Sequence, residues 1–442
     1  MDIHLSDHFT YSRLLRFTLP SIVMMVFTSI YGVVDGFFVS NFAGKTALAA
    51  VNLITPFLML FGALGFVVGT GGSALVSKTL GEGQKERAGS LFSMLVWLSL
   101  TVSVLLAVPG ILFMEPIARL LGAEGQMLND CVVYGRILTL SLPAFILQNE
   151  FQSFLITAER PKLGLAVTVG AGLTNVVLDA LFVGLLDGGI AGAAWATVIS
   201  QVVGGVLPLV WFMCPNSSPL RLGRPVWDSR ALVRTCTNGS SEMMTNLSMS
   251  LVNILYNFQL LRLAGEDGVS AYGAIMYVNF IFISIFIGYS IGSSPVVSFH
   301  FGAGNTEELK SLYKKSLYMM IFGSVAMTAL AELLAAPLAH TFAGYDPELL
   351  VMTRRAFMIH FLALLPSGIN IFGSGFFTAL NDGLVSAIIS FLRAMVFQVA
   401  AVLLLPLVLG LDGIWFSILV AEGAALAVTA SCFVKLRRKY QY

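Results

Sequence analysis

Long apolar runs, broken by Gly, Pro and clusters of charge, dominate this chain of 442 residues. A helix that crosses the hydrocarbon core of a bilayer needs about 20 consecutive, mostly apolar residues. Twelve runs reach that length, with expected ranges of 14–40, 47–77, 90–113, 129–157, 162–186, 190–213, 232–262, 268–299, 311–335, 349–380, 384–409 and 412–434. The pattern therefore predicts an all-α integral membrane protein with twelve transmembrane helices.

Composition supports a membrane protein and argues against a nucleic-acid partner. Hydrophobic residues make up 57% of the chain and charged residues only 11%, whereas about 25% of the residues of a soluble domain are charged. The net charge of +1 gives no overall field that would attract nucleic acid. We therefore expect the lipid bilayer to be the main partner of the chain.

The loop charges predict how the chain lies in the membrane. An even number of spans places both termini on one side. Most Lys and Arg residues between the spans fall on this same side, for example in 78–87, 221–234 and 435–439. Loops rich in Lys and Arg stay in the cytoplasm. We expect a multi-pass protein of the cell membrane with cytoplasmic N- and C-termini.

The chain contains an internal duplication. Its longest polar interruption, 214–231, separates an expected N-lobe (1–213) from an expected C-lobe (232–442). At a constant offset of 221, small residues recur in both halves: Ala43-Gly44 and Ala264-Gly265, Gly71 and Gly292, Ser73 and Ser294, Ser77 and Ser298, Gly81 and Gly302, Gly83 and Gly304. We therefore expect two pseudo-symmetric six-helix lobes of like orientation. Such lobes commonly enclose a substrate cavity and alternate its access by rocking, although a duplicated scaffold without transport is the alternative.

Two aspartates lie within apolar runs, Asp35 in the first and Asp179 in the fifth. A carboxylate at bilayer depth costs roughly 2.5–3.5 kcal/mol even on lenient scales, so such residues usually mark an ion, proton or substrate pathway. Tyr31 precedes Asp35 by four residues, and Asn175 precedes Asp179 by four, so each pair shares one helix face. Thr197 lies in the sixth span, which a short loop joins to the fifth.

These five residues predict a cation site. Hydroxyl, amide and carboxylate oxygens are the ligands that a small hard cation prefers, so Asp35, Asn175, Asp179 and Thr197 would be the ligands if the ion is Na⁺. Two close carboxylates also resist simultaneous ionisation, so a proton would serve equally. The sequence leaves H⁺ and Na⁺ open, and we expect no cofactor other than this coupling ion.

Other embedded polar residues are weaker candidates. Gln148, Asn149 and Glu150 form a polar run in the fourth span, and Glu242 lies in the seventh; all four are candidates for a cavity or substrate contact. Pro20 lies in the same helix as Asp35 and is a candidate hinge, because proline bends helices. Three further residues are expected to have structural roles: Arg393 and Glu422 as an ion pair, and His360 as a packing residue.

At this point the chain resembles the MATE (multidrug and toxic compound extrusion) family over nearly its whole length. The resemblance lies in LPSIVMMVFTSIYGVVDGFFVSNFAG, GTGGSALVSKTLGEG, NVVLDALFV and GSSPVVSFHFGAGN. It implies a V-shaped pair of six-helix lobes that exports amphipathic, often cationic compounds against sodium or proton entry.

Within the family the chain is most similar to the DinF-like branch. That likeness implies an N-lobe ion-coupling site, which falls here on Tyr31, Asp35, Asn175, Asp179 and Thr197, with Tyr134 and Asn149 lining the cavity beside it. Another branch uses a seventh-span glutamate and a tenth-span aspartate. Glu242 matches the first of these, but 361–380 contains no acid, which favours coupling in the N-lobe.

The resulting hypothesis is a monomeric secondary antiporter, coupled to H⁺ or Na⁺ entry, for small amphipathic cations. The alternative is a flippase of related fold for a lipid-linked oligosaccharide or lipid. A flippase cavity would need several basic residues to bind pyrophosphate, and the apparent interior offers only Arg393 and Arg136. An enzyme is disfavoured, because the sequence offers no nucleophile–base constellation and contains no phosphate-binding GxxxxGK[ST] motif.

Overall fold

The computed structural model describes residues 3–442, apart from the side chains of Ser40 and Lys45. The first two residues of the expected N-lobe (1–213) lie outside that range. The first half of the chain forms α1 (Tyr11–Phe38), the π-helical turn η1 (Val39–Ala43), α2 (Lys45–Phe66), η2 (Val67–Gly72), α3 (Ser73–Gly81), α4 (Lys85–Leu112), α5 (Met114–Leu120), α6 (Gly125–Leu140), α7 (Leu142–Thr157), α8 (Pro161–Asp179), η3 (Ala180–Leu185) and α9 (Gly189–Met213).

The second half of the chain is also helical. It contains α10 (Ser229–Gly302), α11 (Thr306–Ala343), α12 (Pro347–Phe361), α13 (Leu364–Ala379), α14 (Gly383–Phe391), η4 (Leu392–Val396), α15 (Phe397–Leu409) and α16 (Leu411–Tyr440). No β-strand occurs within residues 3–442.

Twelve membrane passes follow from these helices in the described part of the chain. Nine helices are long and apolar enough to cross a membrane, and two bent pairs raise the count to 11: α6 with α7 at 59°, and α12 with α13 at 45°. Helix α10 has 74 residues, which corresponds to about 110 Å of helix against a bilayer core of about 30 Å. It reverses at Gly265, where φ is 63° and ψ is −149°, and so makes two passes. The expected fold class is confirmed.

The duplication recurs in the backbone. Gly44 and Gly265, separated by 221 residues, both have positive φ, 95° and 63°, and each lies where one span turns into the next. Gly189 and Gly410 have the same separation and φ of 54° and 59°. Only glycine adopts such values at little cost, so the repeated glycines fix repeated chain reversals.

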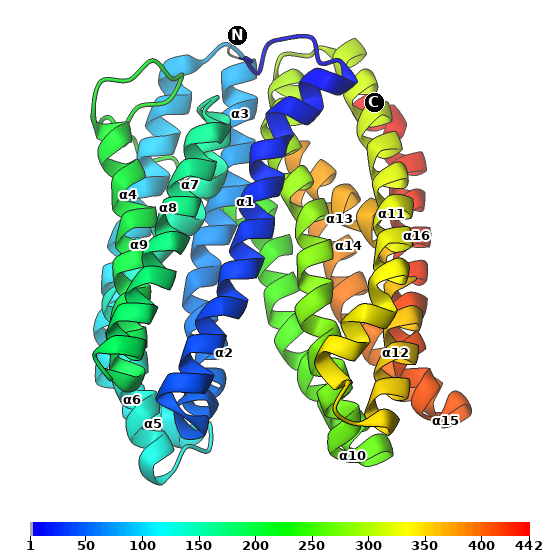
Figure 1. Ribbon diagram of the computed structural model, residues 1–442. Coiled ribbons are helices and arrows are strands. Elements are labelled where there is room, and N and C mark those ends of the chain that lie inside the picture. The colour runs from blue at the N-terminus through cyan, green and yellow to red at the C-terminus, as the bar shows by residue number, and fades with distance from the viewer. Residues whose placement is uncertain (1–2) are drawn as a thin grey trace.

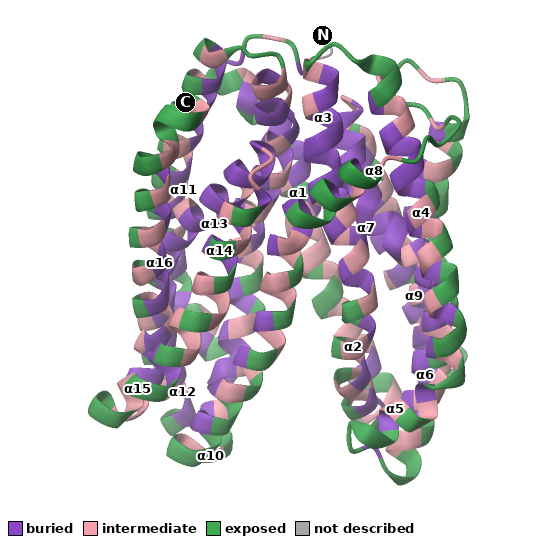
Figure 2. Ribbon diagram, turned by 180° about the vertical axis from the view of Figure 1, so that it is seen from behind, coloured by how far each residue is buried: buried purple, intermediate pink, exposed green. Residues whose placement is uncertain are grey.

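The two halves form separate bundles that converge at one end (Figure 1). One bundle is coloured from blue to green and the other from green to red. The two lie close together at the face that carries both termini and move apart toward the opposite face, so that the molecule has the shape of a V. Seen from behind, buried residues fill the interior of each bundle and the convergent end, while exposed residues follow the outer surfaces (Figure 2).

Glycines permit the close approach at the convergent end. A Cβ on Gly81 of α3 would lie 2.0 Å from the carbonyl oxygen of Phe299, and one on Gly302 would lie 2.1 Å from that of Lys78. These distances leave no room for any side chain, so the backbones of α3 and α10 are in direct contact. Small residues at helix contacts are the usual means of tight packing in lipid.

The outer surface of the bundles is apolar. Large hydrophobic side chains on it are strongly exposed, for example Leu105 (66%), Phe322 (76%), Leu333 (78%) and Leu407 (79%). A soluble monomer rarely exposes so much contiguous apolar area. These side chains are positioned to contact lipid.

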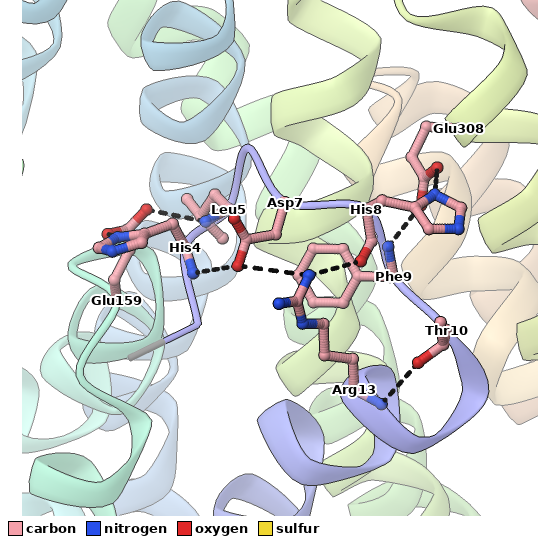
Figure 3. Close-up of polar contacts among 9 residues, drawn as sticks. All are labelled: His4, Leu5, Asp7, His8, Phe9, Thr10, Arg13, Glu159 and Glu308. Carbon is pink, nitrogen blue, oxygen red and sulfur yellow. Dashed lines mark hydrogen bonds and ion pairs between the residues drawn. The ribbon is translucent and has the colours of Figure 1, made fainter. Parts of the chain in front are cut away.

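The N-terminal segment before α1 bridges the two halves at the convergent face (Figure 3). Glu159, in the loop between α7 and α8, accepts hydrogen bonds from the Leu5 N–H at 2.8 Å and pairs with His4 Nδ1 at 2.6 Å. Four residues later the same arrangement recurs in the other half. Glu308 of α11 accepts from the Phe9 N–H at 2.9 Å and pairs with His8 Nδ1 at 2.6 Å.

Each glutamate is expected to hold only its own end of this segment. In Glu308→Ala the Phe9 amide loses its acceptor and should exchange with deuterium at least ~10-fold faster, since a hydrogen bond to a charged group contributes about 1.5–3 kcal/mol. The Leu5 amide should keep its rate, and Glu159→Ala should show the reverse pattern. Hydrogen exchange read by mass spectrometry measures both, and equal acceleration at both ends in either variant would contradict independent anchors.

The polar segment between the halves is shorter than expected. Residues 214–228 have no regular structure, but α10 begins at Ser229, three residues before the expected start at 232. The Asp228 carboxylate accepts the Ala231 N–H at 3.0 Å and the Arg230 N–H at 3.1 Å, which caps the helix. The Ala231 hydrogen bond is the main reason that the pKa of Asp228 lies below its usual value.

Candidate ion-coupling site

A tight contact between α1 and α8 positions the first half of the site. A Cβ on Gly172 of α8 would lie 2.5 Å from the Phe27 ring and 3.0 Å from that of Tyr31. The missing side chain therefore lets α1 lie directly against α8. Asp35 follows Tyr31 by one turn, and Asp179 follows Gly172 by about two turns, so both carboxyl groups reach the same level between the helices.

Local helix irregularities follow each aspartate. The Val39 N–H donates to the carbonyl oxygens of both Asp35 and Gly36, where α1 widens into the π-helical turn η1. Asp179 is the last residue of α8 before η3. Single π-helical turns are frequent at functional sites because they re-aim side chains at the point of the extra residue.

The carboxyl groups of Asp35 and Asp179 are close enough to interact directly, and the side chain of Asn175 lies beside them. Asp179 is fully buried and Asn175 is 2% exposed. Four oxygens of this group are buried without a hydrogen-bond partner among the described residues: Asp35 Oδ1, Asn175 Oδ1, Asp179 Oδ1 and Asp179 Oδ2.

Thr197 of α9 orients the Asn175 amide. The Thr197 hydroxyl donates to the Ala193 carbonyl oxygen at 3.1 Å, so its lone pair is free to accept the Asn175 Nδ2–H at 3.5 Å. The amide oxygen then points away from Thr197. Because all four unpartnered oxygens are acceptors and none has a donor, they repel one another unless a proton or a cation lies between them.

This group opens onto a cavity of about 660 Å³ in the first half of the molecule. Tyr31, Asp35, Asn175 and Thr197 line it, and so do Tyr134 and Gln148. Tyr134 is 4% exposed and interacts with Thr197 and with both aspartates. The structure therefore brings Tyr31, Asp35, Asn175, Asp179 and Thr197 together, with Tyr134 beside them.

Other sequence candidates lie apart from this cavity. Asn149 and Glu150 pack against α2 and η2. A Cβ added to Gly65 would lie 3.0 Å from the Asn149 Cβ, and one added to Gly69 would lie 3.2 Å from the Glu150 Cα. Neither is among the residues that line the cavity. Glu242 lies in the other half and interacts with Arg393.

The candidate hinge remains a prediction. Helix α1 continues through Pro20 without a break from Tyr11 to Phe38. Pro20 itself is buried and lies near the terminal face, beside a separate cavity of about 690 Å³.

The sequence reasoning missed several polar residues of the cavity wall, among them Asn52 of α2 and Ser200 and Gln201 of α9. Gln201 accepts a hydrogen bond from the Ser141 hydroxyl at 2.5 Å, and the Ser200 hydroxyl donates to Ala171 at 2.8 Å. Asn52 and Gln201 are amides within apolar spans, as Asn175 is. Neither has an acid four residues away, which is the spacing that singled out Asn175.

Two acids within a duplicated bundle of membrane helices, one of which lines a wide cavity, are typical of a class of proteins, the membrane transporters built from repeats. The MatE family profile matches residues 20–181 and 243–404 of this chain. Because these segments cover most of both halves, the chain belongs to the MatE family.

Individual proteins agree with this membership. The multidrug export protein MepA of Staphylococcus haemolyticus (strain JCSC1435) is 22% identical over 431 residues, which cover 97% of this chain and 94% of that protein. The crystal structure of MATE in complex with MaL6 is 23% identical, with a TM-score of 0.91 over 98% of this chain and 97% of the other. A second solved structure is the outward-facing conformation of a multidrug resistance MATE family transporter of the MOP superfamily. Its sequence is 24% identical to this chain, and the two structures superimpose with a TM-score of 0.89 over 97% of this chain and 95% of the other.

The expected membership of the MATE family is thereby confirmed, and the chain is a membrane transporter and not an enzyme. Its assignment to the DinF-like branch stays a prediction.

Proposed function

We propose that this transporter is a secondary antiporter that exports small amphipathic cations in exchange for H⁺ or Na⁺. The single observation that carries the proposal is the set of four buried acceptor oxygens on Asp35, Asn175 and Asp179 that have no donor. A site of this kind is completed by a cation. The proposal places the protein as a monomer in the cell membrane, with both termini in the cytoplasm.

Exchange follows from competition for one negative cavity. Asp35 belongs both to the ion group and to the wall of the 660 Å³ cavity, a volume in the range that holds a drug-sized molecule. A cationic substrate in the cavity is stabilised by the ionised aspartates. A proton or sodium ion that binds them removes this attraction, so ion binding and substrate binding oppose each other.

A flippase for pyrophosphate-linked lipids is disfavoured by the positions of the basic residues. Neither the N-lobe cavity nor the adjoining cavity between the halves has a Lys or Arg among its lining residues. Instead, Arg13, Arg16, Arg160 and Lys162 line the cavity beside the N-terminal segment, at the convergent face and not between the bundles.

The coupling ion is identified by transport in proteoliposomes loaded with a cationic dye. An imposed sodium gradient at constant pH, and an imposed pH gradient without sodium, are compared for wild type and Asp179→Asn. We expect one gradient to drive dye efflux in wild type and neither to do so in the variant, because the amide cannot bind a cation as the carboxylate does. Efflux from wild type that needs neither gradient would overturn the proposal.

A further inference from the structure

A cavity of about 690 Å³ lies at the convergent face, between the first turns of α1 and α8. These two helices are neighbours in the first half of the molecule (Figure 1). The N-terminal segment and the loop between α7 and α8 complete the wall, through Ile3, Thr10 and Glu159. The cavity is separate from the ion-coupling site, because the two share no lining residue.

Four basic side chains line this cavity: Arg13, Arg16, Arg160 and Lys162. Arg13 and Arg16 are three residues apart and so share a face of α1. Arg160 is the N-cap of α8, and Lys162 lies in its first turn. Arg16 and Lys162 are exposed, and neither has a hydrogen-bond or ion-pair partner within the described part of the chain. Positive charge therefore gathers here that the protein itself does not neutralise.

The acids near the cavity are already engaged. Of the lining residues that the structure describes, Glu159 alone is acidic, and it accepts the Leu5 N–H and pairs with His4 (Figure 3). Asp7, which is outside the lining, lies 3.8 Å from Arg13 Nη1. A cationic ligand would find no carboxylate without a partner in this wall, whereas an anionic ligand would find several cationic donors.

Two helices begin at the cavity, α1 at Tyr11 and α8 at Pro161. The partial positive charge of a helix N-terminus attracts anions, and no side chain caps the N-terminus of α8. Arginine binds phosphate through two parallel hydrogen bonds, and lysine binds it as a point charge. The donors of this cavity therefore suit a phosphate group.

Farther from the convergent face, α1 and α8 expose apolar side chains. On α1, Leu19 follows Arg16 by three residues and Val23 follows Leu19 by four, so they continue the face of the basic residues. Both are exposed, and Leu19 also lines the cavity. On α8, Leu173 and Val177 are exposed about three and four turns beyond its start. A ligand with a phosphate at one end and apolar chains at the other fits both parts.

We propose that this cavity binds the phosphate of an anionic phospholipid, with the acyl chains along the exposed faces of α1 and α8. The lipid belongs to the leaflet on the side of the two termini, and its headgroup carries no amine, as in phosphatidylglycerol. Basic pockets between the ends of membrane helices recognise such headgroups. The lipid is a bound component of the protein and not a transported compound, so the inference does not depend on the proposed antiport.

Lipid retention by the purified full-length protein tests the site. Immobilised protein is equilibrated with mixed micelles of phosphatidylglycerol and phosphatidylethanolamine, and mass spectrometry of the retained lipid over a titration gives an apparent Kd for each. We expect wild type to prefer phosphatidylglycerol. Arg16→Gln with Lys162→Gln should weaken phosphatidylglycerol binding by ~10-fold or more and remove the preference. Both side chains are exposed, so the variant should fold.

The matched control is Lys310→Gln with Lys314→Gln. These lysines are exposed near the start of α11, outside the cavity, and their replacement removes the same amount of charge. The control should retain the wild-type Kd, and Arg16→Lys with Lys162→Arg, which keeps both charges, should retain most of the binding. Equal weakening in the control and in the cavity variant would mean that the lipid is attracted to the whole basic face, and the inference would be wrong.

Potassium phosphate distinguishes a lipid from a soluble anion. Excess phosphate should release no more lipid than potassium chloride of the same ionic strength, because the acyl chains add apolar contacts that inorganic phosphate cannot make. Release by phosphate alone would assign the cavity to a soluble phosphate compound and refute the lipid site. A wild-type protein without preference for phosphatidylglycerol would refute it as well.

Discussion

Asp35→Asn is expected to reduce ion-driven efflux by ~100-fold while the protein remains folded in the membrane. The amide has the size of the carboxyl group and resembles its protonated form, so the packing of α1 against α8 is kept. It carries no charge that ion binding could neutralise. A hundredfold loss corresponds to about 2.7 kcal/mol, within the range of about 1–3 kcal/mol that is typical of coupling between two binding events.

The measurement is initial-rate dye efflux from proteoliposomes under the gradient that drives the wild type. Asp267→Asn, which replaces an exposed acid near the reversal at Gly265, is the matched control and should retain full activity. Binding of the dye to purified Asp35→Asn protein should become insensitive to the coupling ion. Ion-sensitive binding or undiminished efflux in this variant would refute the site.

Adding two methyl groups at the convergent face is expected to push the two halves apart there. In Gly81→Ala with Gly302→Ala, each new Cβ would lie about 2 Å from a backbone carbonyl oxygen of the opposite half, so the bundles must separate. Overpacking costs typically 1–3 kcal/mol at each position. The two substitutions together should change the equilibrium between the state closed at this face and the state open at this face by roughly 30-fold or more, in favour of the open state.

Spin labels report this opening. Glu86 and Glu307 lie 221 residues apart in the first turns of α4 and α11, are both exposed, and belong to opposite halves. Labels at these positions, in a background without the four native cysteines, should show a longer distance in the double variant. Alanine has the higher helix propensity, so each helix by itself gains stability.

Gly89→Ala is the control for this experiment. An added Cβ at Gly89 meets no atom within 4 Å, and the label distance should stay as in wild type. An unchanged distance in the Gly81→Ala, Gly302→Ala double variant would mean that the glycine contact does not hold the face closed.

The fold class was predictable because its determinants are local. Each span is an uninterrupted apolar run of sufficient length, and bilayer thickness alone converts such a run into a helix that crosses the membrane. The repeat predicted that Gly44 and Gly265 correspond to each other, and both have the positive φ of a chain reversal. The bends that divide α6 from α7 and α12 from α13 were not predicted, although Pro143 and Pro366 lie in the first turns of α7 and α13 and proline interrupts a helix.

The composition of the ion site was partly predictable for the same reason. A spacing of four residues places Tyr31 on the same helix face as Asp35, and Asn175 on the same face as Asp179. Charged residues at bilayer depth are rare, so the two aspartates are conspicuous in the sequence. In the Gln148–Asn149–Glu150 run, by contrast, the three residues point in three directions around α7. Only the packing of α7 against α2 decides that Gln148 alone of the three lines the N-lobe cavity.

By itself, the sequence determined that this protein crosses a membrane twelve times, repeats its own architecture after 221 residues, and places two acids within membrane spans of its first half. These properties depend on residues near one another in the chain. The tertiary structure decided which faces meet: that Gly172 brings Asp179 to Asp35, and that α1 and α8 bring Arg16 and Lys162 to one cavity. Such contacts depend on how each helix is rotated and shifted against its neighbours, which is set by side-chain packing between distant segments and leaves no periodic pattern in the sequence.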